Sequence, residues 1–220
     1  RTQFAEVAAE LGGDWTVTDT GERRRAVLLV SKEGHCLYDL LGRVAAGELD
    51  VDIRAVIGNH MDLASITEAH GIPFHHVPFA KDDKKASFEK VRSLVAEHEP
   101  HAIVLARFMQ ILPSTLCAEW AGRALNIHHS FLPSFIGAKP YHQAHVRGVK
   151  LVGATCHYVT ADLDAGPIIE QDVIRIDHGD TVTDMVRLGR DAEKLVLARG
   201  LRWHLEDRVL IQGNKTITFT

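Results

Sequence analysis

The run Ala26-Val27-Leu28-Leu29-Val30, followed by Ser31-Lys32-Glu33-Gly34, decides the fold class. Five consecutive apolar residues without polar alternation are typical of a strand that is buried on both faces of a parallel sheet. The polar segment after them ends in glycine and predicts a turn. From His35 to about Gly47 the apolar residues recur at helical spacing. A strand that leads directly into a helix is the repeating unit of an α/β protein.

The same alternation continues along the chain. Further apolar runs predict strands at residues 52–57, 74–77, 102–106, 124–128, 151–158 and 168–176. Helical spacing predicts helices at about 61–69, 84–99, 113–120 and 141–147, a long helix at 181–207, and a closing hairpin at 209–219. Such β-α units join by right-handed crossovers. We therefore expect a Rossmann-like α/β fold, with a mostly parallel sheet of about seven strands flanked by helices and with ligands at the carboxyl ends of its strands.

The composition is that of an ordinary globular domain. The 220 residues are 45% hydrophobic and 25% charged, and the net charge of -4 provides no overall attraction to nucleic acid or to an anionic membrane. The longest apolar runs fall far short of the ~20 residues that cross a bilayer. Cys36, Cys117 and Cys156 are odd in number and widely spaced, which favours free thiols in a reducing compartment. Together with the lack of a signal sequence at the amino end, this predicts a cytoplasmic protein.

Common cofactor and metal motifs are missing from the sequence. Neither GxGxxG nor GxxxxGK[ST] occurs, and there is no GxSxG for a serine nucleophile. The 14 histidines include no HExxH and no other recognised zinc spacing, so we expect neither a metal nor a bound cofactor, with a zinc site as the weaker alternative.

One group of polar residues stands out at the end of the strand at 124–128. Because side chains alternate along a strand, Asn126 and His128 face the same side. An amide donor beside an imidazole is suited to stabilising an oxyanion while moving a proton. Asp164, in another loop at a strand end, could orient this imidazole or hold a water. The alternative is structural, with Asn126 capping the loop and His128 simply packed.

Several linked segments resemble one known family of enzymes. Residues 126–133, 137–144 and 162–169, with His157, are similar to the catalytic segments of formyltransferases that use 10-formyltetrahydrofolate. Residues 31–37, 59–60, 71–76 and 106–112 resemble most the formyltetrahydrofolate deformylase branch. The likeness extends from about Arg25 to Phe219.

This resemblance implies a fold, a reaction and a division of the chain. The fold is the Rossmann-like formyltransferase fold. The reaction is hydrolysis of the linear amide C–N bond of 10-formyltetrahydrofolate, which gives tetrahydrofolate and formate and balances one-carbon folates for purine synthesis. Members of this family carry an ACT regulatory domain before the catalytic domain. We expect residues 1–24 to be the remnant end of such a domain, most of which is missing, and residues 25–220 to be catalytic.

The resemblance also implies roles for individual residues. Asn126 donates to the formyl oxygen, His128 is the general acid and base, and Asp164 positions water and tunes His128. The partners are folate and water, with no nucleic acid and no membrane, and the protein is expected to be a homo-oligomer, either a dimer or a tetramer. The residues expected to contact folate are Arg107, Phe108, Met109, Gln110, Ile111, Leu112, Ser130, Lys139, Tyr141, Thr160 and Ala161. Without the family resemblance, the apolar members of the 107–112 segment would be interpreted as ordinary core.

Other functions remain open at this stage. Phosphoribosylglycinamide formyltransferase is the main alternative, although Glu33, His35 and Cys36 occupy the turn where that relative cradles a phosphate. Methionyl-tRNA formyltransferase is weaker, because the chain lacks the extra carboxyl-terminal domain expected of it. A folate sensor without turnover is the non-enzymatic alternative.

Overall fold

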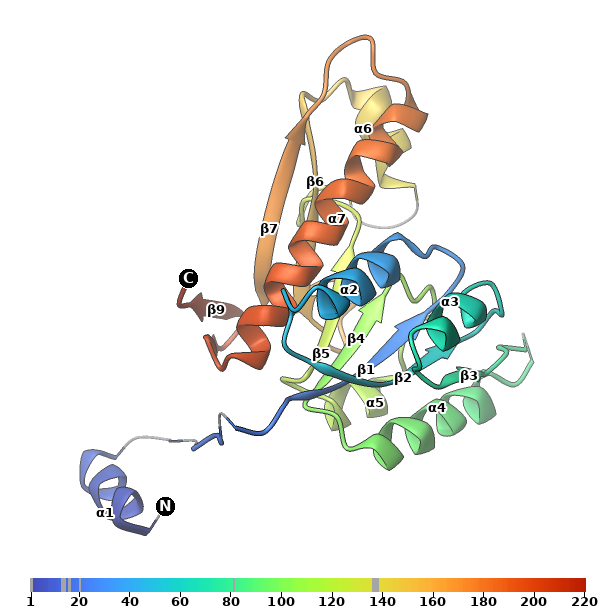
Figure 1. Cartoon of the computed structure of the whole chain (residues 1–220). Coiled ribbons are helices and arrows are strands. Elements are labelled where there is room, and N and C mark those ends of the chain that lie inside the picture. Colours follow the sequence, from blue (N-terminus) through green and yellow to red (C-terminus); the bar gives the residue numbers. More distant parts are fainter. Residues whose placement is uncertain (1, 13–14, 16, 20, 81, 136–138) are drawn as a thin grey trace.

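The computed structural model describes residues 2–12, 15, 17–19, 21–80, 82–135 and 139–220, and it forms an α/β body with one projecting arm (Figure 1). The seven-stranded sheet has the order β3-β2-β1-β4-β5-β6-β7. Its strands are β1 (Arg25–Val30), β2 (Asp52–Gly58), β3 (Phe74–His76), β4 (Ala102–Ala106), β5 (Ala124–His128), β6 (Leu151–Tyr158) and β7 (Ile168–Arg175). The pairs from β3 through β5 are parallel, whereas β5 with β6 and β6 with β7 are antiparallel. The predicted mostly parallel sheet of about seven strands is confirmed.

Helices cover both faces of this sheet. The helices among the described residues are α1 (Thr2–Leu11), α2 (His35–Ala45), α3 (Ala64–Ala69), α4 (Lys84–His98), α5 (Ser114–Glu119), α6 (Pro140–Arg147) and α7 (Val182–Leu205). A separate two-stranded sheet pairs β8 (Val209–Gln212) with β9 (Lys215–Thr218). In Figure 1, α1 stands apart from the body.

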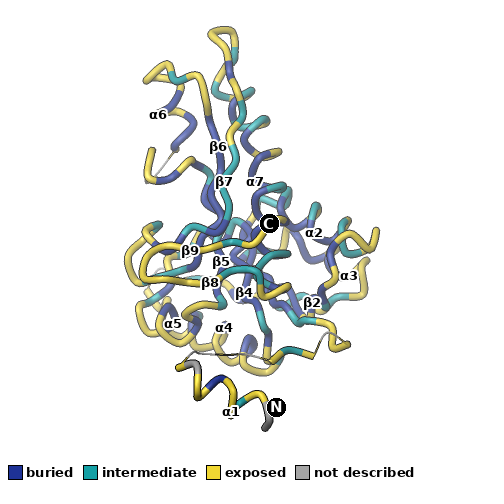
Figure 2. Tube along the Cα trace, turned by 90° about the vertical axis from the view of Figure 1, so that its left-hand side faces the viewer, coloured by how far each residue is buried: buried dark blue, intermediate teal, exposed yellow. Residues whose placement is uncertain are grey.

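Strand β1 shows why its sequence is continuously apolar. Ala26, Leu28 and Val30 pack into the core cluster that contains α2 and α7. Val27 and Leu29 point the other way, into the cluster that contains α4 and α5. Both faces of β1 are therefore buried, and in Figure 2 the residues of β4 and most of those of β2 are coloured as buried.

The projecting arm consists of β6, β7, α6 and the first turns of α7 (Figure 1). A third cluster holds it together, with Tyr141 and Ala144 of α6 packed near Val152, Ile176 and Met185. At the other end of the arm, α7 packs across the main sheet and β6 pairs with β5, so a helix and a strand both connect the arm with the body.

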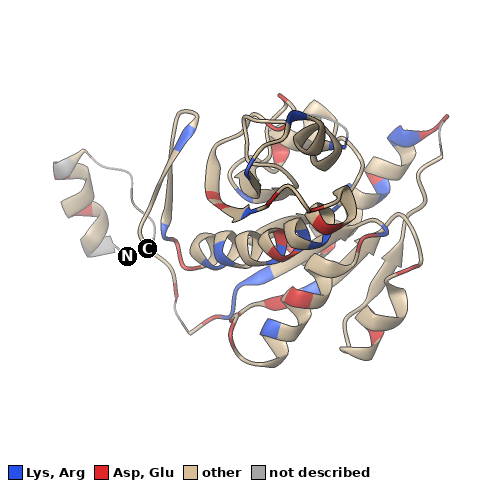
Figure 3. Ribbon diagram, turned by 90° about the horizontal axis from the view of Figure 1, so that it is seen from above, with Lys and Arg blue, Asp and Glu red and all other residues tan. Residues whose placement is uncertain are grey.

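Along the described helices, acidic and basic residues are interspersed rather than gathered by sign (Figure 3). None of the described helices combines the length and apolar character needed to cross a bilayer.

Candidate active site

Asn126 and His128 lie at the carboxyl end of β5, on the same side of the strand. Asn126 is paired with His157 of the antiparallel β6, so the register brings the amide and this second imidazole together. The Nδ2 atom of Asn126 lies 3.2 Å from Nε2 of His157. On the other ring nitrogen, Nδ1 of His157 donates to the carbonyl oxygen of Tyr158 at 2.9 Å.

These contacts define the form of His157. Because Nδ1 carries the proton, Nε2 is an acceptor, and it can only receive the Asn126 amide if the ring is neutral. Burial lowers the pKa of His157, which maintains that neutral form. His157 thus fixes which end of the Asn126 amide faces it.

Asp164 reaches His128 from the loop at residues 159–167. Since β6 runs antiparallel to β5, this loop starts beside the amino end of β5 and has to fold back along it. Asp164 has the left-handed φ of 54°, and its Oδ1 lies 3.3 Å from Nδ1 of His128 and 3.8 Å from Nε2 of His157. An aspartate tolerates this conformation better than most residues do.

The environment keeps Asp164 ionised. Burial alone would raise its pKa, but the hydrogen bond from His128 and the charge of that imidazole outweigh burial and lower the pKa. His128 is itself buried, and its Nε2 has no hydrogen-bond partner among the described residues. A buried polar atom without a partner at a strand end is suited to contacting a ligand.

A cavity of about 560 Å³ opens beside these three residues. Its size is within the ~300–1,000 Å³ typical of small-molecule sites. The cavity is lined by Asn126, His128 and Asp164 and, of the residues expected to contact folate, by Arg107, Phe108, Met109, Gln110, Ile111, Leu112, Lys139, Thr160 and Ala161. Phe108 and Leu112 are buried, whereas Met109 and Ile111 are 58% and 70% exposed, so two of these four apolar side chains remain largely open to solvent.

Ser130 and Tyr141 lie elsewhere. The hydroxyl of Ser130 donates to the carbonyl oxygen of Ser134 at 2.8 Å, within its own loop. The hydroxyl of Tyr141 donates to Glu193 of α7 at 2.8 Å. Neither side chain lines the cavity beside His128, because these hydrogen bonds direct the two hydroxyls away from it.

Three residues near the cavity were not anticipated. His157 appeared only as part of a motif, and Leu163, which is 56% exposed, lines the cavity next to Asp164. Glu193 is 1% exposed and follows Gly189 by one helical turn on the buried face of α7. A carboxylate on the apolar face of a helix is rarely left unpaired. The position of Glu193 among the apolar residues of the long helix could therefore have identified it as a buried, partnered group.

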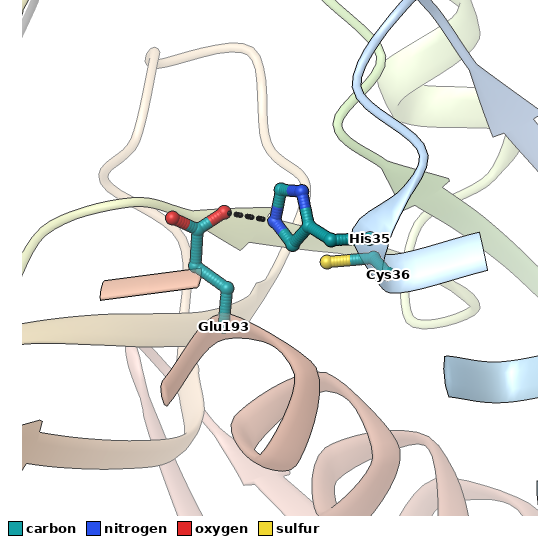
Figure 4. A group of neighbouring side chains, drawn as sticks. All are labelled: His35, Cys36 and Glu193. Carbon is teal, nitrogen blue, oxygen red and sulfur yellow. Dashed lines mark hydrogen bonds and ion pairs between the residues drawn. The ribbon is translucent and has the colours of Figure 1, made fainter. Parts of the chain in front are cut away.

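Glu193 lies close to His35 and Cys36, as Figure 4 shows. Its Oε2 is 2.8 Å from Nε2 of His35 and 3.4 Å from Nε of Arg107. The ligand atoms of His35, Cys36 and Glu193 are within 4.8 Å of one another, which is within reach of a shared metal ion. However, burial and the charge of Glu193 raise the pKa of Cys36 well above its usual range, and Arg107 already supplies a cation. The charge of this cluster is thus balanced by the protein itself.

Comparisons with known proteins give one consistent family. The model of the formyl transferase family matches residues 24–201. A formyltetrahydrofolate deformylase from Corynebacterium sp. (strain P-1) is 47% identical over 217 residues, which cover 99% of this chain and 76% of that protein. The deformylase from Bacillus subtilis (strain 168) is 47% identical over 216 residues, covering 98% of this chain and 72% of the relative.

Solved structures agree with these sequences. A crystal structure of a formyltetrahydrofolate deformylase from Pseudomonas syringae has a TM-score of 0.97 and 59% identity, covering 99% of this chain and 73% of that chain. Glycinamide ribonucleotide transformylase 1 from Symbiobacterium toebii has a TM-score of 0.86 and 27% identity, covering 94% of this chain and 99% of that one. The fold is thus shared with both the deformylase and the transformylase, whereas the high sequence identity is shared with the deformylase.

Proposed function

The chain belongs to the formyl transferase family and, within it, to the formyltetrahydrofolate deformylases, and from this premise we propose that Asn126, His128 and Asp164 perform its chemistry. The activity of these deformylases is the hydrolysis of 10-formyltetrahydrofolate to tetrahydrofolate and formate. The reaction needs a donor for the developing oxyanion, a proton source for the leaving nitrogen, and a held water. The three residues offer one group for each need.

Asn126 is the donor for the formyl oxygen. Its Nδ2 carries two hydrogens, and one of them is directed to Nε2 of His157, 3.2 Å away. The second is left for substrate. When water adds to the formyl carbon, the carbonyl oxygen gains negative charge, and a fixed amide donor stabilises that charge more than it stabilises the planar substrate.

His128 is the general acid and base. In the protonated ring, Nδ1 donates to Asp164 and Nε2 donates to the oxyanion, while the attacking water gives up one proton to the Asp164 carboxylate. As the C–N bond breaks, Nε2 gives its proton to N10, and the proton held by Asp164 returns to the imidazole. The ionised Asp164, 3.3 Å from Nδ1, orients the imidazole and has a second oxygen with which to hold the attacking water. The neighbouring His129 does not compete, because burial, aided by the charge of Arg107, lowers its pKa to about 4.

The observation that carries this proposal is the convergence of Asn126, His128 and Asp164 at the wall of one cavity. The test is to supply the purified chain with 10-formyltetrahydrofolate, with and without glycinamide ribonucleotide, and to measure formate and tetrahydrofolate. We expect formate at the same rate in both. Turnover that required the amine, with the formyl group transferred to it, would contradict hydrolysis.

His157 is a positioning residue in this scheme. The test is a double-mutant cycle on kcat with His157→Phe and Asn126→Ala. If His157 acts through the amide, the double variant should be no slower than Asn126→Ala alone, because the two losses concern one interaction. Independent, additive losses would contradict this role.

The folate is expected in the cavity lined by the loop at residues 107–112. This backbone follows a strand end, so its amide and carbonyl groups can pair with the edge of a pterin as an added strand would. Lys139, Thr160 and Ala161 line the same cavity and complete the proposed contacts. Ser130 and Tyr141 act at most through neighbouring residues, given where their hydroxyls are engaged.

The organisation of the whole protein is also a proposal. The division between residues 1–24 and 25–220 is supported by the family match, which starts at residue 24. A cytoplasmic location is supported by three buried free cysteines. A homo-oligomer is supported by exposed apolar side chains on the arm, including Val146 and Leu151, and sedimentation of the chain at several concentrations tests it.

A further inference from the structure

The ends of two neighbouring strands meet beside the proposed folate cavity. Strands β1 and β4 are parallel and lie side by side in the middle of the sheet (Figure 1). Val30, the last residue of β1, pairs with Ala106, the last residue of β4. The residues that follow, Ser31 and the loop at residues 107–112, therefore leave the sheet at the same edge. The loop lines the cavity, whereas Ser31 does not.

A hydrogen bond joins Ser31 to this loop. The backbone N–H of Met109 donates to Oγ of Ser31 at 2.9 Å. Only 3% of the surface of Ser31 is exposed, so its hydroxyl lies in a medium of low dielectric constant, where a hydrogen bond is electrostatically stronger than in water. The contact thus links the end of β1 firmly to a segment 78 residues further along the chain.

Other contacts hold the two ends of the loop. Near its start, Phe108 is buried, and the centroid of its ring lies 5.8 Å from that of Phe79. At its end, the thiol of Cys117 in α5 donates to the carbonyl oxygen of Leu112 at 3.8 Å. These contacts fix where the loop begins and ends, but they do not fix the residues between.

The middle of the loop has little packing of its own. The side chains of Met109 and Ile111 are largely exposed, so burial does not hold them. Two residues before Met109, Arg107 has the left-handed φ of 63°, which is uncommon outside glycine and persists only where the surroundings maintain it. The bond from Met109 to Ser31 is therefore the contact that holds the backbone between the two ends.

This bond also affects the backbone groups that remain for a ligand. Among the described residues, the N–H groups of Gln110 and Ile111 have no hydrogen-bond partner in the protein. Folded chains rarely leave such donors unpaired, so these two are available to water or to the acceptors of a ligand in the cavity. Because only two soft dihedral angles separate neighbouring peptide planes, fixing the Met109 amide restricts the direction of the next one.

We propose that Ser31 is a positioning residue for the folate: its hydroxyl oxygen holds the Met109 amide, and the loop fixed in this way presents its free backbone groups to the pterin. Since Ser31 does not line the cavity, it acts through the loop rather than on the substrate. The inference rests on the proposed binding of folate along residues 107–112.

The first test is Ser31→Ala, which removes the acceptor. The Met109 N–H then lacks its partner, the loop gains other conformations, and only a fraction of the molecules is competent to bind folate. We expect KM for 10-formyltetrahydrofolate and Kd for tetrahydrofolate to rise about tenfold, which is the equivalent of one hydrogen bond. The value of kcat should stay within about twofold of native, because the loss concerns binding rather than the proton transfers of His128 and Asp164.

Two measurements report these quantities. Initial rates of formate release over a range of 10-formyltetrahydrofolate concentrations separate KM from kcat, and fluorescence titration gives the Kd for tetrahydrofolate directly. A lower kcat with KM and Kd unchanged would contradict a role of Ser31 in placing the folate.

Two conservative variants separate the hydrogen bond from packing. Ser31→Cys keeps the shape of the side chain, but its sulfur is a weak acceptor, so KM and Kd should rise as in Ser31→Ala. Ser31→Thr keeps the hydroxyl oxygen and should restore both constants toward the native values. Native constants in Ser31→Cys together with raised constants in Ser31→Ala would show that volume, not the acceptor, matters, and would overturn the proposal.

A matched control removes a buried hydroxyl elsewhere. Thr67 in α3 is fully buried, and its hydroxyl donates to the carbonyl oxygen of Leu63 at 2.8 Å, but it does not line the folate cavity. Thr67→Ala should therefore leave KM and Kd unchanged even if the variant is less stable. An equal rise of both constants in this control would show that general loosening, rather than the loop, weakens folate binding.

The direct titration keeps this inference separate from the proposed catalytic roles. Binding of tetrahydrofolate needs no turnover, so Kd reports on Ser31 even if the native chain does not hydrolyse its substrate. Unchanged KM and Kd in both Ser31→Ala and Ser31→Cys, with formate release by the native chain intact, would overturn the role of Ser31 and leave the proposed function standing.

Discussion

Replacing His128 by alanine, or Asp164 by asparagine, should lower the rate of formate release by ~10²–10⁴, because each removes a group that moves a proton or stabilises charge in the transition state. Each of the two is one of many residues that line the cavity, so folate should still bind when one of them is replaced. The measurement is kcat for formate release together with folate binding by fluorescence. His178→Ala, which removes an exposed histidine, is the control and should be neutral. Unchanged kcat in either site variant would contradict the mechanism.

The pKa of Asp164 predicts how its contribution to stability depends on pH. Its folded-state pKa is lowered, so as the pH falls the unfolded chain takes up a proton before the native chain does. The stabilisation is therefore complete above the ordinary carboxyl pKa of about 3.9 and is lost as the pH falls through the lower native value. Urea unfolding at about pH 7 and about pH 3 should show the native chain losing its advantage over Asp164→Asn in acid. A difference independent of pH would show that the carboxylate is not stabilised by His128.

At the scale of residues, the sequence predicted the placement of side chains that follow the strand period. It did not predict contacts that depend on packing between elements. Asn126 and His128 are two residues apart on one strand, so their common side needed no tertiary information. The contact of Asp164 with His128 depends on a loop that folds back along β5, which spacing cannot show. Glu193 was missed because its partners come from three other elements.

At the scale of elements, the contact between α6 and α7 depends on one glycine. Gly189→Ala would force the Tyr141 ring away from α7, and such overpacking should lower the free energy of unfolding by about 1–3 kcal/mol. Gly42→Ala is the matched control, since it is also within a helix but a Cβ there meets nothing within 4 Å. It should stabilise the protein by about 0.5–1 kcal/mol through helix propensity. Urea unfolding measures both, and the same sign for the two variants would contradict this packing.

The apolar patterns predicted the presence of helices and strands more reliably than they predicted the residues at which these elements begin and end. Strand β4 has the predicted bounds because its five apolar residues are all buried. Helix α3 begins at Ala64 rather than near Met61, because residues 61–63 form a turn before it. Apolar patterns show which residues are buried in the core, whereas the first residue of a helix depends on hydrogen bonds that composition does not reveal.

At the scale of the whole molecule, the described core clusters agree with the proposal that a catalytic unit begins near residue 25. Among the described residues, the three hydrophobic clusters contain none before Ala26. The segment before it is tied to the body at its end, where the Thr18 hydroxyl donates to Asp207 at 2.7 Å and Arg24 contacts the same carboxylate. A single packed body therefore spans the sheet, its flanking helices and the arm.

Removing residues 1–17, and so retaining Thr18 and Arg24, should leave this body folded and active. Since α1 contributes no residue to the described core clusters, the melting temperature should change by less than about 2 °C, and kcat should be unchanged. Calorimetry and formate release measure the two quantities. A second truncation that also removes Thr18 to Arg24 should be less stable, because Asp207 then loses both partners. Loss of folding in the shorter truncation would show that α1 supports the catalytic body and would contradict a division of the chain near residue 24.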